Sequence, residues 1–575
     1  MYPLAKVKLK IVKLVNQALG RKLVKTNDLI VPPKPEFGDL SLPCFMIAKK
    51  FSKTSVEMAE ILVRKVKLDE YIVAVKAIGP YLNFTFNKIK LAESTIKQIN
   101  IMKQAYGENK NGDGKKVMVE FAHPNTHKSF HIGHLRNIFT GEAISRILVN
   151  SGFKVIRVNY QGDIGLHIAK CLWGISRLQS EYKAAKRGGL KTKASFLGQA
   201  YALGSKNYEE DNAAKQEIIA INQQLYKKDK SIKKVYKETR DWSLKYFADI
   251  YQRVDTKFDR LYFESEVADR GREIVVKNLK QGIFKVSDGA VIFEGEKCGL
   301  HNRVFLTAGG HPTYEAKELG LAELQFKEFS PEKIIHVVGP EQVEYFKVVF
   351  KVLELVLPKL KDREIHVPYG WVRLKEGKMS SRLGNVILGE WLLDEVKKKI
   401  KVMVEKNKKL PNKEKIAEKI TIAAVKYSIL KNGLSKDIAF DINESISLSG
   451  NSGPYLQYTY ARINSIIKKS EVRSKKLEIG NLKSGNLIES KENELIMKLA
   501  RYAEAVETAG KNYDPSEIAK YLFELAQTFN EYYHSVPVLK AKMEVRMARL
   551  ALISSINQVM ANGLNLLGIE VVDEM

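Results

Sequence analysis

The chain has 575 residues, of which 45% are hydrophobic and 28% charged, and no run of about 18 apolar residues, so the composition excludes a membrane-spanning protein. A net charge of +29 favours a polyanionic partner such as nucleic acid, and the length exceeds the roughly 250–300 residues at which one hydrophobic core stops growing. The cysteines, Cys44, Cys171 and Cys298, are odd in number and too widely spaced for a disulfide framework or a zinc knuckle, so we expect reduced thiols.

Residues 1–106 are predicted to form a mixed N-terminal module. It begins with MYPLAKVKLKIVKLVNQALG, which has the apolar spacing of an amphipathic helix with lysines interrupting every apolar run. This segment lacks the apolar core of a secretory signal, and we therefore expect a cytoplasmic protein. The stretch GENKNGDGKK (107–116) collects Gly, Asn, Asp and Lys, which is typical of a linker.

The middle of the chain opens with the pattern of a βαβ unit. KKVMVEFA (115–122) and FKVIRVNYQ (153–161) are β-rich, and LRNIFTGEAISRILVNSG (135–152) between them has apolar residues at helical spacing. This order predicts a parallel sheet with a right-handed crossover. Because ligands of such sheets bind at the carboxyl ends of the strands, residues 120–134 and 159–167 are expected at the site.

From about residue 385 the pattern becomes almost wholly helical. DPSEIAKYLFELAQTFNEYYHSV (514–536) and EVRMARLALISSINQVMANGLNLLG (544–568) repeat apolar residues at helical spacing. Polar stretches at 405–415 and 469–492 separate the helical pieces. The C-terminal part is therefore predicted to be all-α.

The stretch AHPNTHKSFHIGHLRN (122–137) contains four of the ten histidines. His127 and His131 are four positions apart, which would align metal ligands on one helical face, but Pro124 and Gly133 favour a loop and no acidic residue completes a zinc helix. Histidines without a chemical role are a second interpretation. A nucleotide site is favoured because residues 131–134 lie at the entrance of the first crossover helix, where free N–H groups and the helix dipole attract anions.

Two motifs in this order resemble the signature pair of class I aminoacyl-tRNA synthetases: HIGH (131–134) at a helix entrance, and KMSSR (378–382) in a Gly- and Lys-rich loop. The flanking segments are similar to arginyl-tRNA synthetases and follow that family's order from PPKPEFGDLSLPC (32–44) to the terminal LLGIEVVDEM. The similar segments between are VEFAHPNTHKSFHIGHLRN, FDRLYFES (258–265), PTYEAKELGLA (312–322), HVVGPEQVEYFK (336–347), HVPYGWVRL (366–374) and SGPYLQYTYARINSI (452–466).

The resemblance implies a Rossmann-like α/β fold with a parallel-sheet catalytic domain, an α+β N-terminal domain and an all-α C-terminal domain that binds the anticodon. The domains implied are 1–106 for the N-terminal tRNA-binding module, 107–116 for a linker, 117–384 for the catalytic domain with a helical insertion at about 170–250, 385–450 for a helical connector and 451–575 for the anticodon-binding domain.

The family's amino-acid pocket falls on six positions of this chain. A guanidinium is planar and always charged, so a selective pocket needs carboxylates placed for bidentate pairing, which a lysine substrate would lose. Glu318 stands where the family often has Asp, which leaves the pocket depth there open. The positions are Glu120, Asn125, Glu264, Tyr314, Glu318 and Gln342, with the amides suited to the α-amino group and the acids and Tyr314 to the side chain.

The resemblance also implies an ATP site with Mg²⁺ carried by the nucleotide and no structural metal. The second lysine of the general KMSKS pattern is Ser381 here, and Lys128 matches the lysine thought to compensate for it in this family, so we expect Lys128 to be the main phosphate contact. The expected catalytic residues are Lys128, His131, His134, Lys378 and Arg382. The expected ATP contacts are His131, Gly133, His134, Gly165, His167, Met379 and Ser380. Gly165 and His167 fit an ordinary turn equally well. His123 and His127 match no required position and are expected only to border the site.

The implied partners are L-arginine, ATP and tRNA(Arg), with no membrane, and the chain is expected to be a monomer. The positions that match tRNA contacts are Tyr81 and Asn83 for the D-loop and Tyr458, Arg462, Tyr533 and Met575 for the anticodon loop. Aromatic residues at helical spacing also occur in ordinary cores, so a structural role for these tyrosines stays open.

Other functions remain to be separated from this one. A cysteinyl- or lysyl-tRNA synthetase is disfavoured by the absence of metal-binding cysteines and by the acids of the arginine pattern. A non-catalytic RNA-binding paralogue is disfavoured by the intact HIGH motif, Lys128 and the pocket acids. A metal-dependent hydrolase that uses the histidine cluster would contain stoichiometric zinc.

Overall fold

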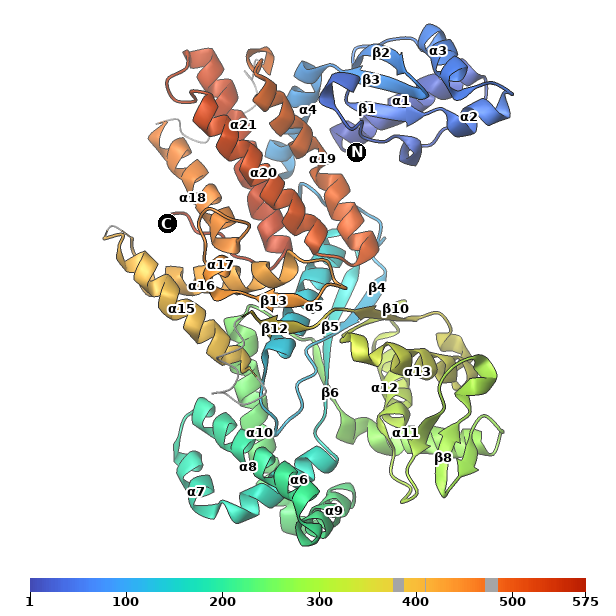
Figure 1. Cartoon of the computed structure of the whole chain (residues 1–575), viewed down its shortest axis with the longest axis vertical. Coiled ribbons are helices and arrows are strands. Elements are labelled where there is room, and N and C mark those ends of the chain that lie inside the picture. The colour runs from blue at the N-terminus through green and yellow to red at the C-terminus, as the bar shows by residue number, and fades with distance from the viewer. Residues whose placement is uncertain (376–386, 409, 471–483) are drawn as a thin grey trace.

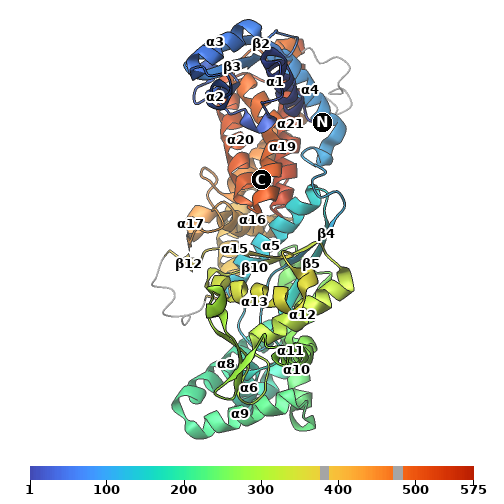
Figure 2. The ribbon, with the colours of Figure 1, turned by 90° about the vertical axis from the view of Figure 1, so that its right-hand side faces the viewer.

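A computed structural model describes residues 1–375, 387–408, 410–470 and 484–575 (Figure 1). The molecule is elongated, with the N-terminal sheet near one end of its long axis and the helices of residues 166–253 at the other, in both views (Figures 1 and 2). The parallel sheet lies between these ends, next to the C-terminal helices.

The N-terminal module is an antiparallel sheet packed with helices. Its strands pair in the order β1-β3-β2, and α1 buries Val7, Ile11 and Val15 at helical spacing. The elements are α1 (Pro3–Leu19), η1 (Thr26–Asp28), η2 (Pro35–Phe37), β1 (Leu40–Pro43), α2 (Phe45–Lys50), α3 (Ser55–Lys65), β2 (Ile72–Ile78), β3 (Tyr81–Phe86), α4 (Lys88–Met102) and η3 (Lys103–Ala105). The predicted α+β character is confirmed.

A five-stranded parallel sheet forms the centre of the chain, in the order β11-β10-β4-β5-β6. The chain first adds β5 and β6 on one side of β4 and later β10 and β11 on the other. The strand order therefore reverses between β4 and β10, where a ligand crevice is expected at the carboxyl ends. The strands are β4 (Lys116–Glu120), β5 (Lys154–Gln161), β6 (Arg260–Phe263), β10 (Lys333–Val338) and β11 (Glu364–Pro368).

Helices cover both faces of this sheet. Successive residues of its strands point to opposite faces, and each face packs in its own buried cluster. Val119 and Ile335 pack in the same cluster as Ile138 of α5 (Ile132–Asn150), whereas Met118 and Ile334 pack with Leu321 of α12 (Tyr314–Phe329) on the other face. The first crossover, β4-α5-β5, is the predicted βαβ unit. The predicted parallel-sheet fold class is confirmed.

Two further units are inserted between strands of the sheet. Between β5 and β6 lies a helical unit with its own core, and between β6 and β10 a three-stranded antiparallel sheet packs against helices. Their elements are α6 (Leu166–Arg177), α7 (Gln179–Arg187), α8 (Leu190–Glu210), α9 (Asn212–Tyr226), α10 (Lys230–Arg253), α11 (Glu264–Leu279), β7 (Lys285–Ser287), β8 (Ala290–Phe293), η4 (Gly295–Cys298) and β9 (Arg303–Leu306). After β10 follow η5 (Pro340–Gln342), α13 (Val343–Val356) and η6 (Pro358–Leu360).

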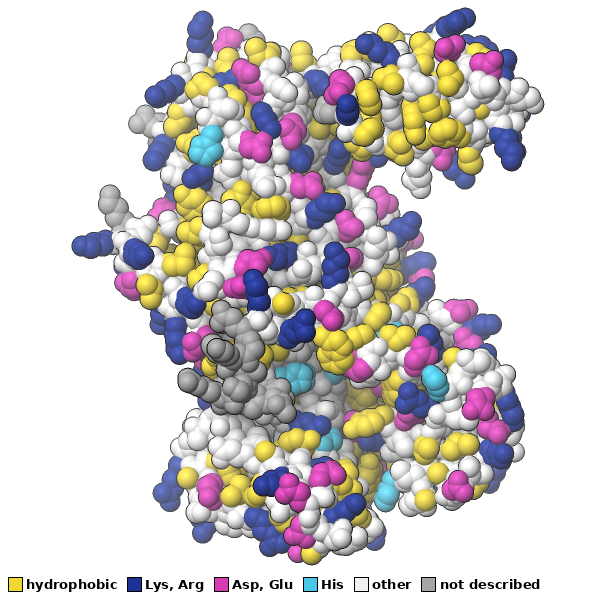
Figure 3. Space-filling model, viewed as in Figure 1, with side chains coloured by type: hydrophobic (Ala, Val, Ile, Leu, Met, Phe, Trp, Pro, Cys, Tyr) yellow, Lys and Arg dark blue, Asp and Glu magenta, His cyan; other side chains and the backbone are white. Residues whose placement is uncertain are grey.

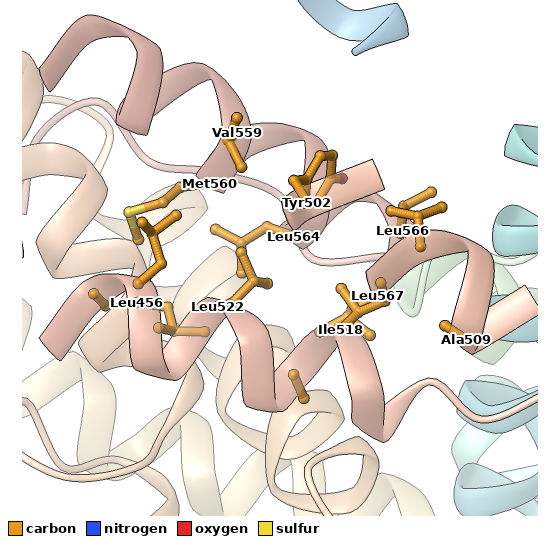
Figure 4. Close-up of a cluster of buried hydrophobic side chains, with 14 of the residues drawn as sticks. Leu456, Tyr502, Ala509, Ile518, Leu522, Val559, Met560, Leu564, Leu566 and Leu567 are labelled. Atoms are coloured by element: carbon orange, nitrogen blue, oxygen red, sulfur yellow. The ribbon is translucent and has the colours of Figure 1, made fainter. Parts of the chain in front are cut away.

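The C-terminal part is helical, with a buried core that joins Leu456, Leu522 and Leu564 of three helices (Figure 4). Its helices are α15 (Gly389–Glu405), α16 (Lys413–Leu430), α17 (Ile442–Ser445), α18 (Gly453–Lys469), η9 (Ser484–Asn486), α19 (Ser490–Asn512), α20 (Ser516–Ser535) and α21 (Met543–Leu566). One short strand, β13 (Ile438–Phe440), interrupts the helices because it pairs in parallel with β12 (Val372–Leu374). The helical pattern of the sequence after about residue 385 did not predict this strand pair.

Candidate active site

The HIGH motif lies at the N-terminus of α5, as the sequence predicts. His131 is the residue that precedes the helix, and the chain after the second motif runs beside it: the Ile132 N–H donates to the Ile387 carbonyl at 2.9 Å and the Gly389 N–H to the Phe130 carbonyl at 3.0 Å. These bonds hold residues 387–389, which follow the second motif in the chain, against the HIGH motif. The predicted residues Lys378, Met379, Ser380 and Arg382 lie outside the described residues.

The two histidines of the motif are stacked and neutral. Their ring centroids are 3.7 Å apart, and the backbone N–H of His131 donates to Nδ1 of His134 at 3.1 Å. Burial and the nearby Lys128 lower the pKa of His131 to about 4, and burial beside His131 lowers the pKa of His134 well below its ordinary value. Because Nδ1 of His134 accepts a bond, its proton is on Nε2, which can donate to an anionic oxygen.

The loop before α5 has an unusual backbone. Ala122, His123 and His127 all adopt positive φ, at 84°, 51° and 63°, although none is glycine. Side chains hold this shape: Asn137 accepts from the Ala122 N–H at 2.6 Å, and the Asn159 side chain accepts from the His123 N–H at 3.1 Å. Such conformations cost about 1–3 kcal/mol each and persist where the surroundings fix them, often at functional sites.

Two adjacent cavities open beside this loop at the carboxyl ends of β4 and β10. The larger, of about 730 Å³, is lined by His131, Gly133 and His134 and by Leu374 and Ile387, which flank the second-motif loop on either side. The smaller, of about 430 Å³, is lined by all six residues predicted to bind arginine: Glu120, Asn125, Glu264, Tyr314, Glu318 and Gln342. The two share a wall made of His123, Asn125, Val338, Glu341 and Gln342. Figure 3 shows histidine side chains in the hollow between the central body and the two lower lobes.

The carboxyl groups of the smaller cavity differ in charge. Burial would raise the pKa of Glu120, but His336 and Gln325, which bond to it at 2.9 and 2.6 Å, hold that pKa below its ordinary value. Burial and the Glu120 charge raise the pKa of Glu318 to about 8. The two carboxyl groups of this cavity therefore have pKa values shifted in opposite directions, which is how active sites give neighbouring acids different roles.

A third acid of the cavity is paired inside the protein. Glu264 Oε2 accepts from Lys317 Nζ at 2.5 Å, and each side chain is 4% exposed. Burial raises the pKa of Glu264 in spite of this ammonium group, and Glu264 raises the pKa of Lys317 against the effect of burial. The charge of Glu264 is therefore balanced by Lys317 inside the protein.

The matches with known proteins cover almost the whole chain. Residues 95–442 match the family model of the class I tRNA synthetase (R) catalytic domain, residues 6–86 the arginyl tRNA synthetase N terminal domain, and residues 456–575 the DALR anticodon binding domain. The chain belongs to the arginyl-tRNA synthetase family. Its relatives include the arginine–tRNA ligases of Clostridium botulinum, 35% identical over 570 residues (98% of this chain, 99% of the relative), and Borrelia hermsii, 33% identical over 577 residues (98% of each).

A solved arginyl-tRNA synthetase, that of Thermus thermophilus, superposes on 99% of this chain and 100% of its own with a TM-score of 0.82 and 26% identity. The enzyme of Plasmodium falciparum, 20% identical, shares the fold with a TM-score of 0.77. The predicted family, the ligase class and the anticodon-binding character of the C-terminal domain are confirmed.

Three residues that this synthetase was expected to use at the nucleotide line neither cavity. Lys128 Nζ lies 5.3 Å from the Tyr201 ring of the helical insertion, while its charge lowers the pKa of His131 from nearby. Gly165 precedes α6. His167 is buried there, its Nε2 has no hydrogen-bond partner in the described part of the chain, and burial lowers its pKa to about 3. The structure therefore groups His131, Gly133 and His134 at one cavity and leaves these three beside it.

Two residues that were not predicted to contact a substrate also line the smaller cavity. His123 lies in the shared wall, where Nδ1 is 3.3 Å from the Tyr160 carbonyl and the buried Nε2 has no partner among the described residues. Gly162 follows β5, and a Cβ there would lie 2.2 Å from Asn125 Oδ1. Its place after a predicted strand was the available signal for Gly162. His127, in contrast, is a buried structural residue bonded to Thr239 Oγ1 at 2.7 Å.

A separate cavity of about 490 Å³ in the C-terminal domain brings together Tyr458, Arg462, Tyr533 and Met575, all expected to face the anticodon. Arg462 donates to the Tyr458 hydroxyl at 3.1 Å and lies over its ring. In the N-terminal module Tyr81 packs against the half-exposed Phe45. Asn83 is 3% exposed and bonded to Ser41, so its expected contact with tRNA is at odds with its burial in the sheet.

Within the described residues, no group of three or more His, Cys, Asp or Glu is placed to hold a metal ion. The four histidines of residues 122–137 point to different partners, since His127 bonds to threonines and His131 stacks on His134. In the same part of the chain no helix has the length and apolar character needed to span a membrane.

Proposed function

We propose that the smaller cavity binds arginine, the larger binds ATP, and the shared wall is where they react. The observation that carries this proposal is that all six positions expected from the family pattern line one cavity next to the HIGH motif. Cavities at a topological switch point with a few convergent polar groups are the usual ligand sites of parallel sheets.

The reaction proceeds in two steps at the shared wall. A carboxylate oxygen of arginine attacks the α-phosphorus of ATP and pyrophosphate leaves, which gives arginyl-adenylate. A ribose hydroxyl at the 3′ end of tRNA(Arg) then attacks the carbonyl carbon, and AMP leaves with the electron pair of the broken bond. The protein contributes alignment and charge stabilisation rather than covalent chemistry.

The residues of the larger cavity suit the phosphates. His131 and His134 supply neutral N–H donors at the N-terminus of α5, where the helix dipole favours negative charge. Lys128 is proposed to turn from Tyr201 to the phosphates, assisted by Lys378 and Arg382, with Met379, Ser380, Gly165 and His167 as further nucleotide contacts. Mg²⁺ would enter with ATP, held mainly by phosphate oxygens and water.

The residues of the smaller cavity suit arginine. Glu120 offers both carboxylate oxygens to a guanidinium, Glu264 and Glu318 offer further acceptor oxygens, and Tyr314 is exposed. Asn125 and Gln342, in the shared wall, suit the α-ammonium group, and the free Nε2 acceptor of His123 adds a third partner there. This division places the carboxylate of arginine toward the nucleotide.

The remaining parts bind tRNA in this proposal. Tyr81 would contact the D-loop, and Tyr458, Arg462, Tyr533 and Met575 would contact the anticodon loop from their common cavity. The domains would be 1–106, a linker at 107–116, 117–384 with the insertion at about 170–250, 385–450 and 451–575. We further propose a cytoplasmic monomer without a structural metal.

The decisive assay is ATP–pyrophosphate exchange with arginine, lysine or no amino acid, with and without tRNA(Arg). Exchange that depends on arginine is expected, and exchange supported by another amino acid but not by arginine would overturn the substrate assignment.

Lys128→Ala tests the phosphate assignment. Because Ser381 replaces the usual second lysine of the loop, Lys128→Ala is expected to lower arginylation at least about tenfold more than Lys378→Ala, in line with the effect of a charged transition-state contact. Equal or reversed losses would contradict the role given to Lys128.

A further inference from the structure

A histidine that the family pattern does not include in the pocket lies directly behind it. His336 is in β10, opposite Glu120 of β4 in the parallel register, and Glu364 of β11 lies on its other side. His336 Nδ1 is 2.9 Å from Glu120 Oε1, and Nε2 is 2.7 Å from Glu364 Oε2. The three side chains are at most 4% exposed.

The geometry determines the charge of this ring. A carboxylate oxygen accepts hydrogen bonds, so both ring nitrogens must carry protons when both acids are ionised. The neighbouring Glu120 and Glu364 accordingly hold the pKa of His336 well above its ordinary value, although burial acts in the opposite direction. The result is a buried imidazolium shared between two strands.

His336 and Gln325 fix Glu120 at both of its oxygens. His336 bonds to Oε1, and Gln325 Nε2 of α12 donates to Oε2 at 2.6 Å. Phe346 and Phe350 of α13 pack on the imidazole, with ring centroids 5.0 and 5.7 Å away. The carboxylate that ends β4 therefore has one orientation, and each of its oxygens keeps a lone pair for a ligand in the cavity.

A structural role alone does not account for this arrangement. Replacing buried ionic groups by apolar residues of similar volume is often neutral or stabilising, because ions lose their hydration on burial. Every other residue of β10 after Lys333 is Ile or Val, so an apolar side chain at position 336 would fit the pattern of the strand. The histidine is the exception, and it stands at the position that meets the pocket acid.

The charge balance of the cavity suggests what the histidine does. Glu318 faces the same cavity, and two neighbouring buried carboxyls resist ionising together. Without His336, Glu120 would lie near the carboxyl group of Glu318, and the neighbouring His123 is a poor source of counter-charge because burial lowers its pKa. With His336 in place, the pKa of Glu120 is lowered and that of Glu318 is raised, so a proton shared by the two acids is held preferentially by Glu318.

We propose that His336 is a positioning residue of the arginine site, which fixes the charge and orientation of Glu120 by bridging it to Glu364. This inference rests on the proposed function, since it takes Glu120 as an arginine contact. His336 acts through Glu120 and does not itself line the cavity. The bridge thus ties arginine recognition to the register of three parallel strands.

The test is His336→Gln in arginine-dependent ATP–pyrophosphate exchange from pH 6.5 to 9 with saturating tRNA(Arg), in which arginine is varied at saturating ATP and ATP is then varied at saturating arginine. The expected result is a KM for arginine raised at least tenfold, with kcat and the KM for ATP changed less than threefold. The KM should rise further as pH falls, because Glu120 without its cation becomes easier to protonate.

His366→Gln is the matched control. His366 lies on the same sheet face, opposite His336 in the β11 register, and packs on Phe346, but its Nε2 faces the Val338 carbonyl at 3.2 Å rather than a pocket acid. Its KM for arginine should stay within twofold of the wild-type value. An equal rise in both variants would overturn the proposal.

The double variant His336→Gln with Glu364→Gln separates positioning from stability. In the single variant the Glu364 carboxylate lacks its counter-charge. The second substitution removes that charge, so the urea midpoint should rise again toward the wild-type value while the KM for arginine stays raised. Recovery of the KM together with the midpoint, or an unchanged KM in a folded single variant, would overturn the inference. Exchange independent of arginine in the wild type would overturn the proposed function as well.

Discussion

The two cavities expected to recognise substrates are built in different ways. The arginine cavity collects residues from six separated segments, and its acids Glu120 and Glu264 are already paired with His336 and Lys317 inside the protein. The C-terminal cavity is formed by the faces of α18 and α20 and the chain end, and its Arg462 lies against tyrosine rings near solvent. Removing one partner of a pair in the arginine cavity therefore leaves a buried charge without its counter-charge. Removing Arg462 from the C-terminal cavity breaks only contacts that lie near solvent.

The largest effect is expected for Glu264→Gln. The change leaves the Lys317 ammonium buried without its counter-charge, and breaking a buried pair in this way costs about 3–5 kcal/mol. Urea unfolding should show a loss of roughly that size. In pyrophosphate exchange, kcat/KM for arginine should fall at least about 100-fold.

The double variant Glu264→Gln with Lys317→Met removes both charges and serves as the control. Its stability should return toward the wild-type value, whereas its arginine kinetics should remain impaired. A Glu264→Gln enzyme with wild-type kinetics would show that the paired acids of the arginine cavity do not meet the substrate.

A smaller effect is expected for Arg462→Ala at the C-terminal cavity. The side chain is partly exposed and bonds to Asn530 and Tyr458, so its loss would disturb the tyrosines of this cavity, and a base stacked on an aromatic side chain contributes about 1–3 kcal/mol. The KM for tRNA(Arg) should rise about tenfold in aminoacylation while the KM for arginine stays unchanged. Lys520→Ala removes an exposed charge of the same domain away from this cavity and should leave both constants within about twofold. A change in the arginine KM would mean that the two regions are coupled.

The smallest effect concerns pH. The loop beside the arginine cavity is held by the buried His127, whereas the histidine at the C-terminal cavity, His534, is exposed. Burial lowers the pKa of His127 to about 3, so the unfolded chain binds a proton below about pH 6.5 that the folded protein does not. The contribution of His127 to the free energy of unfolding is therefore fully present above about pH 6.5 and is lost as pH decreases toward 3. At pH 6 the loss is about 1 kcal/mol.

Urea titrations between pH 8 and 5 on the wild type and on His127→Asn check this effect. The variant should lose less stability over that range than the wild type, and a His534→Asn control should follow the wild type. Parallel curves for the wild type and His127→Asn would contradict a neutral buried ring at this position.

Local patterns in the sequence were sufficient for the elements of the catalytic centre. The β-rich runs 115–122 and 153–161 and the helical spacing between them predict β4, α5 and β5, because strand and helix periods depend on neighbouring residues only. The ordered motifs also led to six residues that line one cavity, Glu120, Asn125, Glu264, Tyr314, Glu318 and Gln342. That these six residues lie together could thus be predicted from the family resemblance, whereas their role in binding arginine stays a prediction.

Only the tertiary structure decided how these residues are charged and which neighbours hold them. His336 and Lys317 look like ordinary members of a strand and a helix until β4, β10, α11 and α12 bring them against Glu120 and Glu264. Likewise Asn83 matches a position that contacts tRNA in the family, yet the N-terminal sheet buries its side chain. Pairing and burial arise from segments far apart in the chain, and no local period encodes which side chains will share a low-dielectric interior.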